Sequence, residues 1–125
     1  MSAPRQSLGL PRTERLRKRA GFQAVQNRGR KLHTEHFLVF VLAHPTIEGK
    51  APAPPRLGLT VSRKIGGAVQ RNRVKRLVRE AFRRTKTLFP RGVDVVFVAK
   101  KSAPDVTFGQ VTGEIEKLCG RYFTR

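Results

Sequence analysis

Carboxylates and histidines are the side chains of this sequence that could cleave a phosphodiester bond or hold a metal ion. Phosphodiester cleavage by a protein needs clustered carboxylates for metal ions, or an acid and a base such as two paired histidines. The eight acidic residues are scattered, and of them only Glu114 and Glu116 are close in sequence. Two residues apart on a helix, they would not face each other. His33, His36 and His44 surround one apolar stretch, but nothing indicates that two of them act as a pair. The pattern predicts no catalytic residue and no metal site.

The densest run of cationic residues lies between Val69 and Lys86. It contains a ladder of like charges at a spacing of four residues, Arg71, Lys75, Arg79 and Arg83. Such a ladder destabilises an isolated helix unless something neutralises it, and Glu80 is the one acid in the segment. Arginine outnumbers lysine here, which suits two-point contacts with phosphate. The segment is therefore predicted to bind phosphate groups.

The charge of the whole chain supports a polyanionic partner. Its 125 residues carry 27 Lys and Arg against 8 Asp and Glu, a formal net charge of +19. Nucleic acid and anionic membrane are the two candidates. No apolar run approaches the roughly 20 residues of a spanning helix, and residues 1–12 lack the apolar stretch of a signal peptide. The single cysteine, Cys119, leaves no internal disulfide or Cys-rich zinc site and favours a reducing cytoplasm. We expect nucleic acid and no membrane.

RNA fits the pattern better than DNA. A basic helix that reads a DNA groove usually belongs to a helix-turn-helix or precedes a heptad zipper, and neither pattern is found. Gly58, Thr60 and Ser62 alternate with apolar residues on an expected strand, so they would form a small polar face. That face could be the floor of a groove, with phenylalanines near it. A charged track beside aromatic rings suits an extended single strand.

The spacing of apolar residues predicts one small sheet with helices packed on it, an α+β or α/β sandwich. The expected elements are a helix carrying Phe22 and Val25 that ends at Gly29, strands at 31–33, 37–43, 57–62 and 93–99, and helices at 69–86 and from Thr107 onward. The 69–86 helix has apolar residues at 74, 77, 78, 81 and 82, which form one stripe. The Pro-rich segment 51–55 is expected to close a hairpin. Residues 1–18 are expected to form a basic, flexible tail, and residues 19–125 one domain.

The string Arg71-Asn72-Arg73-Val74-Lys75-Arg76-Leu77-Val78-Arg79-Glu80 resembles the signature of the bacterial ribonuclease P protein subunit. The segment that precedes it, Leu59 to Gly66, is similar to the same family's approach to that helix. The similarity runs from about Leu10 to Arg125. It implies a two-layer α-β sandwich with a four-stranded sheet, the order αβββαβα and a left-handed βαβ crossover, against the usual right-handed preference.

The resemblance also implies the partners. They are the catalytic RNA of ribonuclease P and the 5′ leader of precursor tRNA, which that RNA removes with bound Mg²⁺. The protein would hold no cofactor of its own. Residues implied to contact the catalytic RNA are Arg71, Asn72, Arg73, Lys75, Arg76 and Arg79. Residues implied to line a leader cleft are Phe22, Phe40, Thr60, Ser62, Arg63, Lys64 and Lys100.

Several alternatives stay open at this stage. Phe22 and Phe40 could be core residues, and Asn72 could bond locally at the helix start. Where the family often has a second aromatic residue, this chain has Gln26. Where the family usually has an Asn before the basic helix, this chain has Gly67. A structural ribosomal protein and a stand-alone nuclease are the two competing functions.

Overall fold

The computed structural model describes residues 15–16, 19–44, 49 and 51–123. Its main elements follow the order αβββαβα. They are α2 (Arg19–Arg28), β1 (Arg30–His33), β2 (Phe37–Ala43), β3 (Arg56–Thr60), α3 (Ala68–Thr85), β4 (Val93–Ala99) and α4 (Phe108–Tyr122). Three short 3-10 helices join them, η2 (Arg63–Ile65), η3 (Lys86–Leu88) and η4 (Ala103–Asp105). The predicted α+β class and element order are confirmed.

The four strands form one sheet in the order β1-β2-β4-β3. β4 pairs antiparallel with β2 and parallel with β3, and its first five residues are buried. The prediction that 51–55 closes a hairpin is therefore wrong, because β4 lies between β2 and β3. Proline-rich loops mark a change of direction but do not say which strand is the neighbour. The handedness of the β3–α3–β4 connection stays a prediction.

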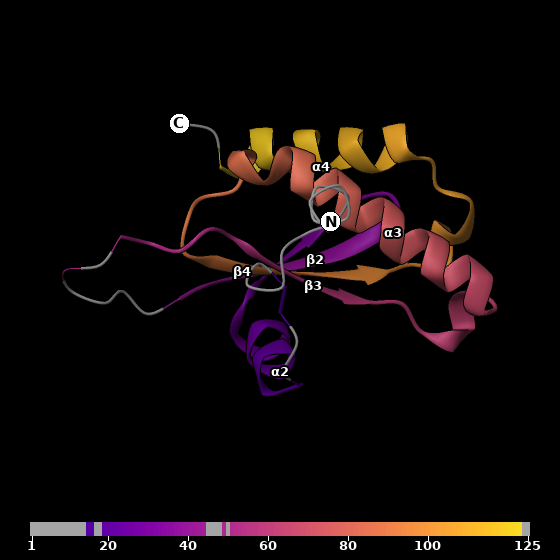
Figure 1. The fold of residues 1–125 in the computed structure, drawn as a ribbon, viewed down its shortest axis with the longest axis horizontal. Coiled ribbons are helices and arrows are strands. Elements are labelled where there is room, and N and C mark those ends of the chain that lie inside the picture. Colours follow the sequence, from indigo (N-terminus) through magenta and orange to yellow (C-terminus); the bar gives the residue numbers. More distant parts are fainter. Residues whose placement is uncertain (1–14, 17–18, 45–48, 50, 124–125) are drawn as a thin grey trace, which may run out of the picture.

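The helices lie on both faces of the sheet (Figure 1). α3 and α4 cover one face and make the two-layer sandwich, while α2 covers part of the other face. The larger core lies between the sheet and the α3–α4 layer. A smaller core of Leu16, Val25 and Val96 lies under α2. None of the helices described is both long and apolar enough to cross a membrane.

The predicted apolar stripe of α3 is what docks this helix. Val74, Val78, Ala81 and Phe82 are each fully buried, and Leu77 is partly buried against the same core. The Phe82 ring lies 5.4 Å from the Phe89 ring, which is within the range of favourable aromatic pairs. Packing of this stripe, rather than helix propensity, fixes the direction of the charged side chains on α3.

Both long helices begin with a side-chain cap. The predicted capping box of α4 is confirmed, since Gln110 N–H donates to Thr107 Oγ1 at 3.1 Å and Thr107 N–H donates to Gln110 Oε1 at 2.9 Å. At the start of α3, Gly67 N–H donates to Gln70 Oε1 at 3.1 Å. Gln70 thus supplies a cap where Gly67 has no side chain.

Candidate RNA-binding surface

The cationic side chains of α3 divide into groups with different surroundings. Arg73 and Arg84 lie on the flank that faces η4 and α4. Arg73 Nη1 donates to the Pro104 carbonyl at 2.9 Å, and the Arg84 guanidinium lies 5.3 Å from the centre of the Phe108 ring. Arg73 is therefore already held by the protein, although it belongs to the set predicted to contact RNA.

Glu80 neutralises two further arginines of α3. Its carboxylate accepts from Arg83 at 3.0 and 2.5 Å and from Arg84 Nε at 2.8 Å. The hydrogen bond from Arg83 is the main reason that the pKa of Glu80 is lowered. Arg83 and Arg84 are thus locally paired, and neither belongs to the set predicted to bind RNA.

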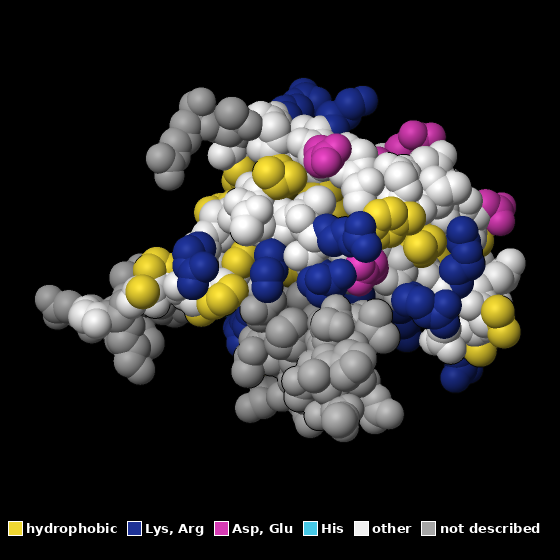
Figure 2. All heavy atoms as spheres, turned by 45° about the horizontal axis from the view of Figure 1, so that its top comes forward, with side chains coloured by type: hydrophobic (Ala, Val, Ile, Leu, Met, Phe, Trp, Pro, Cys, Tyr) yellow, Lys and Arg dark blue, Asp and Glu magenta, His cyan; other side chains and the backbone are white. Residues whose placement is uncertain are grey.

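Asn72, Lys75 and Arg76 make up the outer face of α3. Asn72 and Arg76 are exposed and Lys75 is half-buried. Among the described residues, none of the three takes part in an ion pair or a side-chain hydrogen bond, so the local bond considered for Asn72 is not formed. Figure 2 shows Lys and Arg side chains in several groups over the face that carries α3, with few acidic ones between them. These three side chains are available to a partner.

Arg71 and Arg79 lie on the flank of α3 nearer β3. Burial, and to a lesser degree the charge of Arg15, lowers the pKa of Arg79. Within the described part of the chain, Arg71 Nε is buried without a hydrogen-bond partner. The backbone of Arg15 forms a β-bridge with Leu57 at the edge of β3. The repulsion between the charges of Arg15 and Arg79 therefore acts between the sheet edge and α3. A phosphate group at this flank would relieve it.

Four of the residues predicted to bind the leader lie where β3 ends. Thr60 is half-buried, and Ser62, Arg63 and Lys64 are exposed. Because η2 joins β3 to α3, these residues lead directly to the cationic face of the helix. Polar and basic side chains are therefore exposed both just after β3 and on the outer face of α3, with Val69, which is 84% exposed, between them in the chain.

Phe22 and Phe40 share the sheet face that α2 partly covers. Phe40 lies opposite Val96, which in turn lies opposite Gly58. A Cβ on Gly58 would come within 2.9 Å of the Phe22 ring. Gly58 is therefore buried under Phe22 and is not part of an open groove floor, as its small size had suggested. Both rings are partly buried against the small core, so each combines a packing role with an accessible edge.

Lys100 is attached to the turn between β1 and β2. Its Nζ donates to the Thr34 carbonyl at 2.6 Å, and its backbone N–H donates to the His36 carbonyl at 2.9 Å. An ammonium group carries three donors, so two stay available for a ligand. Lys100 is near the predicted cleft but is positioned by the protein.

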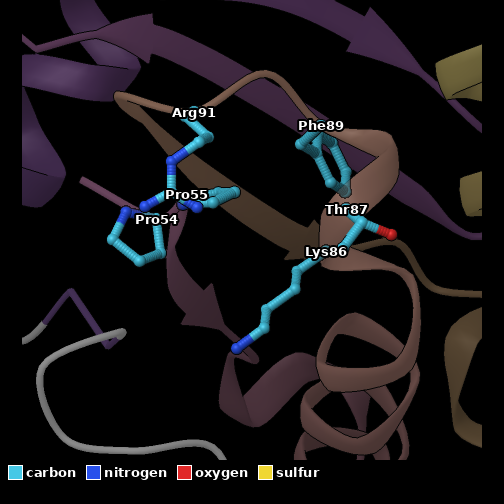
Figure 3. A pocket seen from close by; sticks show the side chains of 6 residues that line it. All are labelled: Pro54, Pro55, Lys86, Thr87, Phe89 and Arg91. Carbon is cyan, nitrogen blue, oxygen red and sulfur yellow. The ribbon is translucent and has the colours of Figure 1, made fainter. Parts of the chain in front are cut away.

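The sequence did not indicate two hollows and one cluster of charged side chains that the described residues form. The smaller hollow, about 260 Å³, is lined by Pro54, Pro55, Lys86, Thr87, Phe89 and Arg91 (Figure 3). The larger, about 910 Å³, lies beside α2 and includes His44, Arg56 and Asp94. Asp94 accepts from Arg56 at 2.7 and 2.9 Å and from His44 at 2.5 Å. The hydrogen bond to Asp94 raises the pKa of Arg56, so this cluster ties three strand ends together.

Two of the histidines and the single cysteine are engaged in the fold. His36 and His44 stand at opposite ends of β2, and each contacts a carboxylate, Glu114 and Asp94 respectively. Burial raises the pKa of the Cys119 thiol to about 12, so it stays protonated at neutral pH. What the structure does assemble, and the sequence did not indicate, is a group of Glu35, His36 and Glu114. No local signal could have found it, since Glu114 is 78 positions from His36.

Known proteins share both the sequence and the fold. A family model described as Ribonuclease P matches residues 10–122. The chain is 46% identical over 114 residues to a ribonuclease P protein component from Desulfovibrio desulfuricans, covering 90% of this chain and 85% of that one. The solved RNase P protein from Thermotoga maritima superposes with a TM-score of 0.73 at 35% identity, covering 89% and 99% of the two chains. A Staphylococcus aureus RNase P protein mutant with defective mRNA degradation activity gives 0.75 at 31% identity, covering 94% and 93%. On sequence and structure together, this chain belongs to the ribonuclease P protein family.

Proposed function

We propose that this protein is the RNA-binding subunit of a ribonuclease P and assists removal of the 5′ leader from precursor tRNA in the cytoplasm. The observation that supports the proposal is the exposure of polar and cationic side chains both just after β3 and on the outer face of α3. The outer face of α3, around Asn72, Lys75 and Arg76, binds the catalytic RNA. The segment from Thr60 to Lys64, at and just after the end of β3, binds the leader.

The chemistry of cleavage belongs to the RNA in this proposal. Mg²⁺ prefers six oxygen ligands and usually keeps several waters. The metal-capable group that the described residues provide, Glu35 with His36 and Glu114, includes an imidazole and lies on the α4 side of the sheet. It does not suit the Mg²⁺ that cleaves the leader, which we assign to the RNA. The protein supplies binding and charge neutralisation.

The leader side of the proposal rests on the combination of rings and cations. Single strands bind along basic tracks on which successive bases stack against aromatic side chains. Phe40 offers a partly covered ring near the middle of the sheet, opposite Val96, and Arg63 and Lys64 are exposed cations just beyond the end of β3. Gln26, also exposed, can bond to a base edge where the family often has a ring. The family match favours this assignment over a structural ribosomal protein.

A leader-length series tests the assignment. In reconstituted holoenzyme, Arg63→Ala with Lys64→Ala should weaken binding of precursor tRNA with a leader of several nucleotides by about 10-fold, because two charge-assisted contacts are lost. Binding of leaderless tRNA should change less than about twofold. Phe40→Ala should show the same selectivity through lost stacking. Equilibrium binding across the series measures both.

The matched control is Lys101→Ala with Lys117→Ala, which removes the same charge from exposed positions outside both of these regions. This control should weaken binding of precursor tRNA only slightly, and by the same factor at every leader length. An equal loss for leaderless tRNA in the Arg63/Lys64 variant would contradict the leader assignment.

A further inference from the structure

The turn between β1 and β2 is fixed by contacts from three directions. Thr34 Oγ1 accepts from Phe37 N–H at 3.1 Å. Lys100 bonds to Thr34 and His36 after β4, and Ser102 Oγ donates to the Glu35 carbonyl at 3.3 Å. The backbone that carries Glu35 and His36 is therefore held in place before any ligand binds.

Glu114 of α4 reaches this turn from the helical layer. Its Oε1 accepts from the His36 N–H at 3.0 Å, and its Oε2 contacts His36 Nδ1. The side chains of His36 and Glu114 are 9% and 13% exposed, whereas Glu35 is exposed. One donor atom from each of the three residues lies within 4.8 Å of the other two.

The charge around this group is unusual for such a basic protein. Lys and Arg outnumber Asp and Glu by 27 to 8. Even so, neither Glu35 nor Glu114 forms an ion pair with Lys or Arg among the described residues. By contrast, Glu80 and Asp94 are both paired with arginine. Among the described residues, Glu114 is thus bonded to His36, and neither carboxylate of the group is paired with Lys or Arg.

We propose that Glu35, His36 and Glu114 bind a divalent transition-metal ion, with Zn²⁺ as the best match. An imidazole nitrogen with two carboxylate oxygens is a donor set typical of Zn²⁺ and related ions, and three protein ligands leave a position for water. The ion takes the place of the proton between His36 and Glu114, so the Glu114 carboxylate moves outward to the ligand spacing of the metal. The bound ion clamps the β1–β2 turn to α4 and stiffens the segment that carries Lys100. This site goes beyond the proposed function, because it needs no RNA.

Metal-dependent stability of the full-length protein, without RNA, tests the site. After treatment with EDTA and dialysis, ZnCl₂ should bind with one equivalent per chain and raise Tm by about 5 °C at saturation. MgCl₂ at the same concentration should raise Tm by less than about 1 °C, since Mg²⁺ avoids nitrogen ligands. Glu35→Gln, at an exposed position, should fold normally and weaken Zn²⁺ at least ~10-fold. Calorimetric titration and thermal unfolding give the two readouts.

Glu116→Gln is the matched control, because it removes the same charge from an exposed position of α4. It should bind Zn²⁺ as the unaltered protein does. Glu114→Gln, which keeps the size of the side chain, should abolish the Tm increase. The proposal is overturned if Zn²⁺ leaves Tm of the unaltered protein unchanged, if Glu35→Gln responds equally, or if Mg²⁺ stabilises as well as Zn²⁺.

Discussion

Lys75→Ala combined with Arg76→Ala should weaken binding to the catalytic RNA by at least ~10-fold. The variant loses two charge-assisted contacts with phosphate, made by cations of α3 that have no ion-pair partner in the part of the chain that the structure describes. Binding of the unaltered protein should fall roughly 10³- to 10⁵-fold between about 50 and 200 mM salt if about 6–10 phosphates are contacted. In the variant, the slope of log affinity against log salt should decrease by about 1.5–2. Filter binding across a salt series measures both quantities.

Arg83→Ala combined with Arg84→Ala provides a control with the same change of net charge on the same helix. Both arginines are paired with Glu80, so their loss should change RNA affinity and the salt slope much less. Equal losses in the two double variants would mean that overall charge, and not the outer face of α3, determines binding.

Phe82→Ala should lower the free energy of unfolding by about 3–5 kcal/mol, the usual cost of truncating a fully buried phenylalanine. The ring is 0% exposed and stacks against Phe89, so its loss leaves a cavity where α3 docks. Small domains have total stabilities of about 5–15 kcal/mol, so the folded fraction should fall steeply on mild heating. Urea unfolding followed by circular dichroism measures the change.

Leu88→Ala is the comparison for this substitution, since Leu88 is 43% exposed. It should cost less than about 1 kcal/mol. Under the proposed function RNA binds the folded form, so excess RNA should partly restore the Phe82→Ala protein. A loss of less than about 1 kcal/mol in Phe82→Ala would contradict the docking role of the apolar stripe.

Periodicity predicted the elements that carry the binding surface. The stripe from Val74 to Phe82 required one orientation of α3, and the structure confirms it. The capping residues Thr107 and Gln110 act locally, so sequence alone could find them. Local patterns of this kind are reliable because the interactions that produce them join residues only a few positions apart.

Contacts between distant segments could not be predicted in the same way. Nothing local to the Pro-rich loop indicates that β4 enters between β2 and β3. The hydrogen bond from Arg73 to Pro104 depends on how α3 lies against η4. The spacing of the arginines along α3 does not indicate which of them has such a partner. The meeting of His36 with Glu114 likewise depends on the packing of α4 over the β1–β2 turn.

The arrangement explains how a strongly basic helix can be stable before RNA binds. Glu80 neutralises one end of the ladder, Pro104 holds Arg73, and the buried stripe fixes the backbone. Cations that have no such partner are left on the outer face. These outer-face cations are the ones that the proposed function assigns to RNA.

The proposed division of roles between protein and RNA is tested by cleavage of a precursor tRNA with Mg²⁺. The reaction is carried out with the protein alone, with the catalytic RNA alone, and with both together. The purified protein alone should leave the substrate uncut. Addition of the protein to the catalytic RNA should strengthen substrate binding and leave the cleavage position at the 5′ end of the mature tRNA. Accurate 5′ cleavage by RNA-free protein would contradict the account.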